Sequence, residues 1–258
     1  MRESSGEPAA VTRRRLFGIT AGTAASLVAA DAPAPALAGS PTVAGTPAVT
    51  SAGASAREVT SLDAEGAWRR LAGGNHRFVT GHQTHPHESL RWRESLVEGQ
   101  HPFAVVLGCA DSRVPPELVF DHGLGDLFTI RSAGEVLDNS VLGSVEYAVE
   151  HLGVPLVVVL GHAKCGAVSA TIDVVRGRGQ VSGDVSVLVR SIEPAVLATP
   201  PDGDEARFLA AAVDNQAKRV ASLMLERSVT IRTAVAHHGV KVVAASYQLD
   251  TGAVTRLT

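Results

Sequence analysis

Three short apolar runs, each bounded by turn residues, lie in the middle of the chain. They span residues 103–107, 127–130 and 156–160. Continuous apolar runs of this length are typical of strands buried on both faces of a parallel sheet. Apolar residues at helical spacing fill 141–152, between the second and third runs. A strand, a helix and a strand in this order indicate a βαβ unit, and therefore an α/β fold.

Further elements are expected on both sides of this unit. We predict a first helix that starts near Ser61, with Ser61 as its N-cap and Glu65 in its first turn. Its apolar face would be interrupted by Gly73-Gly74 and consists of Trp68, Leu71, Phe78 and Val79. Helical patterns also fill residues 86–97, 166–175, 184–198 and 205–227, and a last strand is predicted at 241–249. Residues 58–258 therefore read as one α/β domain.

Composition and charge narrow the classes of function. The 258 residues are 45% hydrophobic and 19% charged, which is ample for a sizeable core. The formal net charge is −3, and no basic stripe runs through the body of the chain. Electrostatics therefore give no support for a nucleic acid or an anionic membrane as partner.

The N-terminal segment reads as a targeting signal. Arg13, Arg14 and Arg15 precede a weakly apolar stretch at 16–30, which is too short to span a bilayer. A small-residue cleavage pattern follows at 36–38. We predict a twin-arginine signal peptide over 1–38, a flexible linker over 39–57, export from the cytoplasm and no stable membrane association after cleavage. The alternative is an unstructured N-terminus with chance arginines.

The chain contains two cysteines, Cys109 and Cys165. In an oxidising compartment two cysteines would ordinarily favour a disulfide. Their placement points elsewhere, because Cys109 directly follows the first apolar run, and His162 and Cys165 directly follow the third. The carboxyl ends of parallel strands meet at one edge of a sheet, where α/β proteins bind ligands. Two thiols and one imidazole would bind a zinc ion and leave its fourth coordination position to an exchangeable ligand, as in catalytic zinc sites.

An acidic and a basic residue follow the first cysteine closely. Asp111 and Arg113 are two positions apart, and a paired guanidinium would keep the carboxylate ionised and fixed. Such a carboxylate could orient a metal-bound oxygen, or it could move onto the metal as a fourth ligand. A plain alternative is that Asp111 caps a helix beginning near Pro115-Pro116 and that Arg113 lies on the surface.

The motifs around these residues resemble the paired signature of β-class carbonic anhydrases. The resemblance rests on Cys109-Ala-Asp-Ser-Arg-Val114 and Gly161-His-Ala-Lys-Cys-Gly166, with further matching blocks over residues 65–255. It implies Zn²⁺ on Cys109, His162 and Cys165, with Asp111 as a conditional fourth ligand.

The same resemblance implies a four-stranded parallel sheet extended by an edge strand and flanked by helices. The implied assembly is a homodimer or a dimer of dimers, and the implied reaction is reversible hydration of CO₂ to bicarbonate by a zinc-bound hydroxide. Asp111 and Arg113 would be the catalytic pair. Two negatively charged thiolates lower the acidity of a zinc-bound water relative to a site with three imidazoles. The active form, with hydroxide on zinc, should therefore be favoured at mildly alkaline pH.

The chain departs from the family pattern at several positions. Glu135 stands where relatives commonly have asparagine, and Val106 replaces a tryptophan of the bicarbonate-regulated subgroup. His122 stands where relatives often have a glutamine that faces the substrate. His122 is therefore a candidate substrate-binding residue, and the alternative is that it is a surface loop histidine. Gly166, at the end of the second matching motif, is another candidate substrate-binding residue.

Two other functions fit parts of the sequence. The same site could hydrolyse COS or CS₂, which are chemically analogous to CO₂. Alternatively, the protein could be a zinc-binding or redox-sensing protein without catalytic activity, in which Cys109 and Cys165 form a disulfide. Asp111 and Arg113 speak against this alternative, because neither is needed merely to hold a metal.

Overall fold

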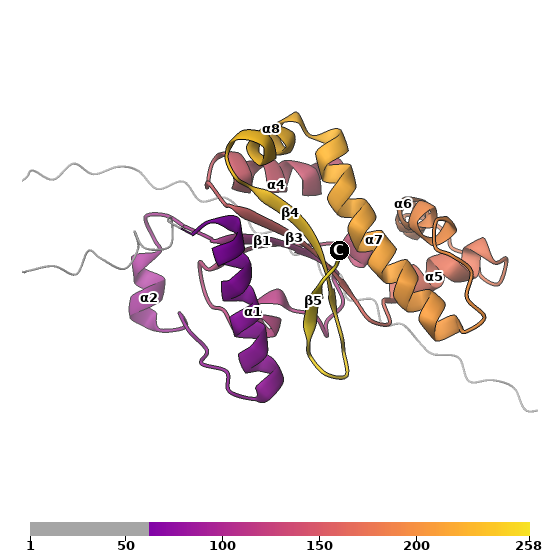
Figure 1. Cartoon of the computed structure of the whole chain (residues 1–258), viewed down its shortest axis with the longest axis horizontal. Coiled ribbons are helices and arrows are strands. Elements are labelled where there is room, and N and C mark those ends of the chain that lie inside the picture. Colours follow the sequence, from indigo (N-terminus) through magenta and orange to yellow (C-terminus); the bar gives the residue numbers. More distant parts are fainter. Residues whose placement is uncertain (1–61) are drawn as a thin grey trace, which may run out of the picture. The chain divides into compact units, whose positions relative to one another are not determined.

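A five-stranded sheet forms the centre of residues 62–258, the part of the chain that the computed structural model describes (Figure 1). In spatial order the strands are β2 (Leu127–Arg131), β1 (Ala104–Gly108), β3 (Leu156–His162), β4 (Lys241–Tyr247) and β5 (Val254–Arg256). The first four are mutually parallel, and β5 pairs antiparallel with β4. The expected four-stranded parallel sheet with an added edge strand is thus confirmed. The predicted signal peptide and linker lie outside the described residues.

Helices cover both faces of the sheet because successive strand residues point to opposite sides. Helices α4 (Asn139–Glu150), α7 (Glu205–Arg227) and α8 (Val229–His237) pack on the face that carries Val105, Leu107, Val157 and Val159. Helices α1 (Ala64–Thr80) and α3 (Pro116–Val119) pack on the opposite face, against Val106 and Val158. Burial on both faces explains the apolar runs of β1 and β3. The prediction that β2 is fully buried is wrong, because β2 lies at the edge of the sheet and is half-buried.

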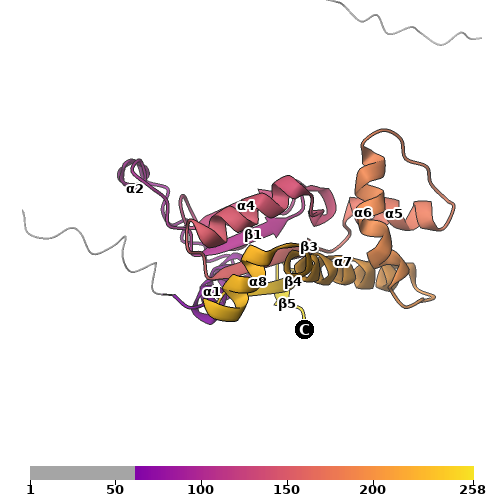
Figure 2. The same ribbon diagram turned by 90° about the horizontal axis from the view of Figure 1, so that it is seen from above.

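A third apolar cluster lies beyond the carboxyl ends of the strands. Helices α5 (Gly166–Val175) and α6 (Val185–Leu197) pack there against each other and against residues near the start of α7. Figure 2 shows α5 and α6 at one end of the domain and α2 (Leu90–Ser95) at the other. Cys109 and Cys165 belong to this third cluster.

The first helix begins later than predicted and is not interrupted. Asp63 is its N-cap and accepts a hydrogen bond from the backbone N–H of Gly66, so the predicted start at Ser61 is wrong. The helix continues through Gly74, where a Cβ atom would lie 1.7 Å from the carbonyl oxygen of Phe120. Glycine at this position therefore permits close packing of α1 on α3. Val79, expected on the apolar face, is 42% exposed.

Other differences from the predicted elements concern short or weakly packed segments. The predicted helix at 86–97 is only six residues long, because Ser89 caps it and none of its residues is buried. Helix α3 begins where the alternative interpretation of Asp111 placed a helix, and β5 is the edge strand that the family resemblance implied without giving its position. Helix α8 was not predicted, and the last parallel strand ends at Tyr247 rather than at 249. Among the described residues, no helix has both the length and the apolar character needed to cross a bilayer.

Candidate metal centre

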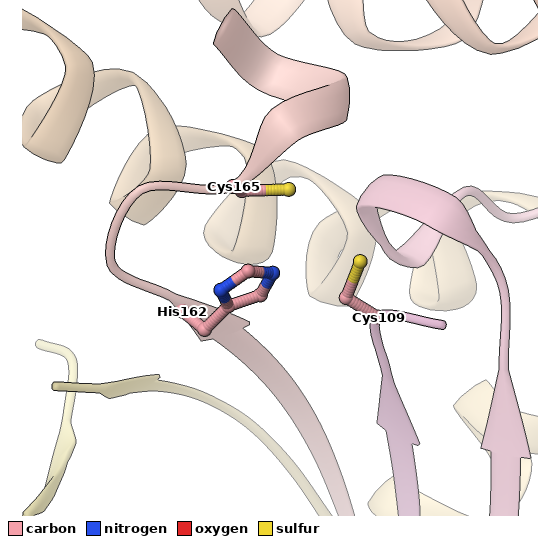
Figure 3. A group of neighbouring side chains, drawn as sticks. All are labelled: Cys109, His162 and Cys165. Atoms are coloured by element: carbon pink, nitrogen blue, oxygen red, sulfur yellow. The ribbon is translucent and has the colours of Figure 1, made fainter. Parts of the chain in front are cut away.

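The metal-binding residues predicted from the two strand ends meet in the structure. Because β1 and β3 are neighbours, with Gly108 in register with Leu160, Cys109 and His162 leave the sheet side by side. Cys165 follows three residues later, at the start of α5. One ligand atom from each of the three lies within 4.8 Å of the others, and all three residues are buried. Figure 3 shows the three side chains pointing toward one another.

The imidazole of His162 is oriented for metal binding. Its Nδ1 lies 3.0 Å from the carbonyl oxygen of Ala163, which places the proton on Nδ1. The other nitrogen, Nε2, is buried and has no hydrogen-bond partner among the described residues. The lone pair of Nε2 is therefore free for a cation.

The two sulfurs influence each other's ionisation in this geometry. Pairing with Cys165 lowers the pKa of Cys109, aided by His162 and by the backbone N–H of Gly134, 3.3 Å from Sγ. The same pairing and burial raise the pKa of Cys165, although the backbone N–H of Val168 in the first turn of α5 opposes this rise. A second thiolate therefore requires a cation between the sulfurs.

These residues fit zinc. Two thiolates and one imidazole form a soft, buried donor set that matches the preferences of Zn²⁺. A divalent cation would give the unpartnered Nε2 a partner and would compensate negative charge on the two sulfurs. Three protein ligands leave one of the four coordination positions of zinc for an exchangeable ligand. Catalytic zinc sites have such a position, whereas structural zinc sites do not.

Asp111 and Arg113 form the expected pair beside the cluster. The guanidinium donates from Nε to Oδ1 at 2.9 Å and from Nη2 to Oδ2 at 2.7 Å. This pairing holds the pKa of Asp111 well below its usual range. Oδ2 of Asp111 lies 3.9 Å from Nε2 of His162. In this geometry the carboxylate faces the centre while both of its oxygens bind Arg113, and its role as a conditional fourth ligand stays a prediction.

The alternative interpretation of Asp111 as a helix cap is wrong. Helix α3 has Pro115 as its N-cap, without any side-chain capping bond. The carboxylate of Asp111 instead accepts the backbone N–H of Arg113 at 2.9 Å. The loop is held in place by Arg131, which donates to the carbonyl oxygens of Cys109 and Asp111.

A turn behind Cys109 adds groups that sequence reasoning missed. This 3₁₀ turn, Ala133–Glu135, contributes the Gly134 N–H to the sulfur, and Gln216 of α7 donates to the Gly134 carbonyl at 3.0 Å. Gln216 is 1% exposed. Because Gln216 lies among the apolar residues on one face of α7, the sequence could have indicated that its side chain is buried and hydrogen-bonded.

The two candidate substrate-binding residues have different surroundings. His122 is buried, so the surface-loop alternative is wrong; it lies edge-on to Phe103 and 3.7 Å from Asp126. Within the described part of the chain it is not part of the metal cluster. Open space surrounds Gly166, whereas Gly161 lies tightly against Val213 of α7. Substrate contacts of His122 and Gly166 stay predictions.

The family model described as carbonic anhydrase matches residues 104–254, which contain the whole metal cluster. The chain belongs to the carbonic anhydrase family. Carbonic anhydrase 2 of Mycobacterium tuberculosis is 43% identical over 190 residues, which cover 72% of this chain and 89% of that protein. A carbonic anhydrase of Mycolicibacterium smegmatis is 52% identical over 131 residues, covering 51% of this chain and 64% of that protein.

Solved β-carbonic anhydrases share the fold. One from Aspergillus fumigatus is 26% identical, with a TM-score of 0.59, and the match covers 74% of this chain and 89% of that one. A structure described as a tetrameric β-carbonic anhydrase from Sordaria macrospora also has a TM-score of 0.59, at 22% identity, covering 74% and 96%. The β-class resemblance of the sequence is thus confirmed.

Proposed function

We propose that this carbonic anhydrase catalyses the reversible, zinc-dependent hydration of CO₂ to bicarbonate and a proton. The observation that carries the proposal is the buried cluster of two sulfurs and one imidazole nitrogen beside an ionised Asp–Arg pair. When bound, zinc lowers the pKa of a coordinated water from 15.7 to about 7, which supplies a nucleophile at neutral pH.

Asp111 and Arg113 then orient the reaction. Arg113 keeps the carboxylate ionised, so Asp111 accepts a hydrogen bond and does not donate one. With zinc bound, Asp111 would accept a hydrogen bond from the attacking hydroxide and would thereby turn a lone pair of its oxygen toward the carbon of CO₂. The side chain of Asp111 is 17% exposed, so the pair lies between the enclosed ligands and solvent.

Stopped-flow CO₂ hydration by the purified protein, with zinc content measured on the same sample, tests this function. We expect turnover that rises toward mildly alkaline pH in a protein holding one zinc per chain. A fully zinc-loaded protein that is inert at pH 8.5 would contradict the proposal.

Replacing the orienting carboxylate separates catalysis from metal binding. We predict that Asp111→Ala keeps one zinc per chain and loses about 10²-fold in kcat, since only the oriented hydrogen bond is removed. Asp173→Ala is the matched control, because Asp173 forms an exposed ion pair with Arg178 away from the centre. Native turnover in Asp111→Ala would refute the role given to Asp111.

We also propose that the chain assembles as a homodimer or a dimer of dimers. The tetrameric β-carbonic anhydrases of Sordaria macrospora, which share this fold, support such an assembly. Light scattering at several protein concentrations tests it, and a monomer at micromolar concentration would contradict it.

Export by the twin-arginine route is a further proposal, supported by Arg13, Arg14 and Arg15 and by the small residues at 36–38. Fractionation of cells that express the native chain and an Arg14→Lys, Arg15→Lys variant tests it. We expect a protein cleaved near residue 38 outside the cytoplasm only for the native chain, and no stable association with membranes.

A further inference from the structure

Gln216 is a buried amide on α7 that the reaction described above does not use, and it is 1% exposed. The buried residues nearest to it along this helix are apolar: Ala212, Val213, Ala217 and Val220. Its Nε2 donates to the Gly134 carbonyl at 3.0 Å, and its Oε1 has no partner among the described residues. A buried amide with one unpaired polar atom costs stability compared with an apolar residue of similar size, so packing within α7 does not account for this glutamine.

The glycine that accepts this hydrogen bond lies in a confined backbone conformation. Gly134 has a φ of 66°, in the left-handed region. A Cβ atom on it would lie 2.6 Å from Cδ1 of Ile192 in α6 and 3.2 Å from Cβ of Ala167 in α5. Glycine is therefore required here, yet it is also the residue with the greatest backbone freedom. A contact from outside the turn must select one conformation, and Gln216 supplies such a contact.

The same glycine contacts a metal ligand, because its backbone N–H lies 3.3 Å from Sγ of Cys109. The N–H and the carbonyl of Gly134 are related by the φ and ψ of this one residue. Holding the carbonyl in place therefore fixes the direction of the N–H. A hydrogen bond from a backbone N–H to a thiolate orients the sulfur and moderates the electron density that it gives to a metal.

We infer that Gln216 is a positioning residue of the metal centre, which holds the Gly134 N–H against the Cys109 sulfur while this sulfur binds the metal. Both hydrogen bonds of this connection are present in the structure. If Gln216 only satisfied a buried carbonyl, its replacement would change stability and leave the metal ligand unaffected. The inference rests on the zinc site of the proposed function but not on CO₂ as the substrate, so it is tested without turnover.

Nuclear magnetic resonance of the protein loaded with ¹¹³Cd²⁺ measures the hydrogen bond to the sulfur. A spin coupling connects the metal to an amide proton across the sulfur when the N–H donates to a metal-bound thiolate. We expect this coupling at Gly134 in the native chain and its loss in Gln216→Met, which has similar length and no donor. Couplings of the metal to the β protons of Cys109 should persist in both proteins, because the metal stays bound. A native protein without the Gly134 coupling would overturn the inference, and so would a full coupling in Gln216→Met.

Asn215→Leu is the matched control, because it removes the neighbouring amide on α7. Asn215 donates to the hydroxyl of Thr199 at 3.0 Å rather than to a residue that contacts the sulfur. Both variants lose one side-chain hydrogen bond, whereas only Gln216→Met should lose the coupling at Gly134. Loss of this coupling in Asn215→Leu as well would contradict the inference, since any disturbance of α7 would then have the same effect.

A second variant keeps the test decisive if Gln216→Met does not fold. Gln216→Asn retains an amide on a side chain that is one methylene shorter, so its nitrogen no longer reaches the Gly134 carbonyl. We expect the coupling at Gly134 to be lost in this variant too, and a native coupling there would refute the role of Gln216.

The cobalt-loaded protein gives an optical readout of the same hydrogen bond. An N–H donor lowers the energy of the sulfur lone pairs, so its loss shifts the charge-transfer band from thiolate to Co²⁺ to longer wavelength. We expect this shift in Gln216→Met and a native band in Asn215→Leu, and an unshifted band in Gln216→Met would contradict the inference. The zinc affinity of Gln216→Met should also fall about 10-fold, as is usual when an outer partner of a metal ligand is lost. A native zinc affinity would count equally against the inference.

Discussion

Two buried polar regions of this domain satisfy their charges in opposite ways. Asp126, which is 3% exposed, accepts hydrogen bonds from Arg70 at 3.0 Å, His87 at 2.7 Å and the backbone N–H of Gly123 at 3.0 Å. The metal centre has the reverse arrangement. There Nε2 of His162 and both oxygens of Glu135 have no partner among the described residues.

The comparison shows that burial alone does not decide the pKa of a carboxyl group. Burial alone would raise the pKa of Asp126, yet the nearby ring of His122 and the hydrogen bonds from Gly123 and His87 lower this pKa to about 2. Burial raises the pKa of Glu135, and there no donor opposes it. The protein itself supplies the counter-charges of the first region, whereas the second region requires an external cation. The unpartnered Nε2 of His162 is therefore available to a metal ion.

The largest expected effect comes from removing one ligand of the second region. Cys165→Ser should lose zinc, and catalysed hydration should fall to background, because the hydroxyl does not replace a thiolate. Metal analysis and stopped-flow assays measure both effects. Asp126→Asn should keep stoichiometric zinc. Loss of zinc from Asp126→Asn would remove the distinction between the two regions.

The second prediction concerns stability. Asp126→Asn should lower the free energy of unfolding by about 2 kcal/mol at neutral pH, since the pKa of this carboxyl is about 2 when folded and about 3.9 when unfolded. A lowered pKa stabilises the fold above pH 4, and this contribution disappears as the pH falls toward 2. Urea titrations of the zinc-loaded proteins should therefore show a difference that narrows with acid. A difference independent of pH would contradict the prediction.

The smallest effect is expected at Arg70, which is partly exposed. Arg70 pairs with Asp126 and lies over the ring of Phe103, 4.2 Å from its centroid. Arg70→Lys keeps the charge and loses the planar contacts, which should cost about 0.5 kcal/mol. Urea denaturation measures the free energy of unfolding of the variant. A decrease as large as that of Asp126→Asn would contradict the prediction, because it would mean that the Arg70 contacts provide most of the stabilisation in this region.

Much of the fold could be predicted from the sequence, because strands that are buried on both faces leave a strong hydrophobic pattern. Strands β1 and β3, buried along their whole length, appeared as apolar runs, and α7 was predicted with its observed limits, 205–227. Elements without such a pattern were placed poorly or missed. Strand β5 has only three residues and its position was not predicted, and α8 was missed because it follows α7 directly, separated only by the capping Ser228.

The ligand set was predictable because it depends on where two strands end. Its surroundings were not, since they depend on contacts between residues far apart in sequence. Gln216 reaches Gly134 across 82 positions, and no local pattern indicates that contact. The burial of His122 follows from packing against Phe103, which the loop sequence does not reveal.

The pairing of β1 with β3 also has a kinetic consequence. Cys109 and His162 become neighbours only when β1 pairs with β3, and β2 and α4 lie between these strands in the sequence. Closing so long a segment is slow compared with forming a helix. A newly made chain therefore cannot bind zinc through all three ligands before this long-range pairing has formed. Uptake of the metal thus reports that β1 and β3 are paired.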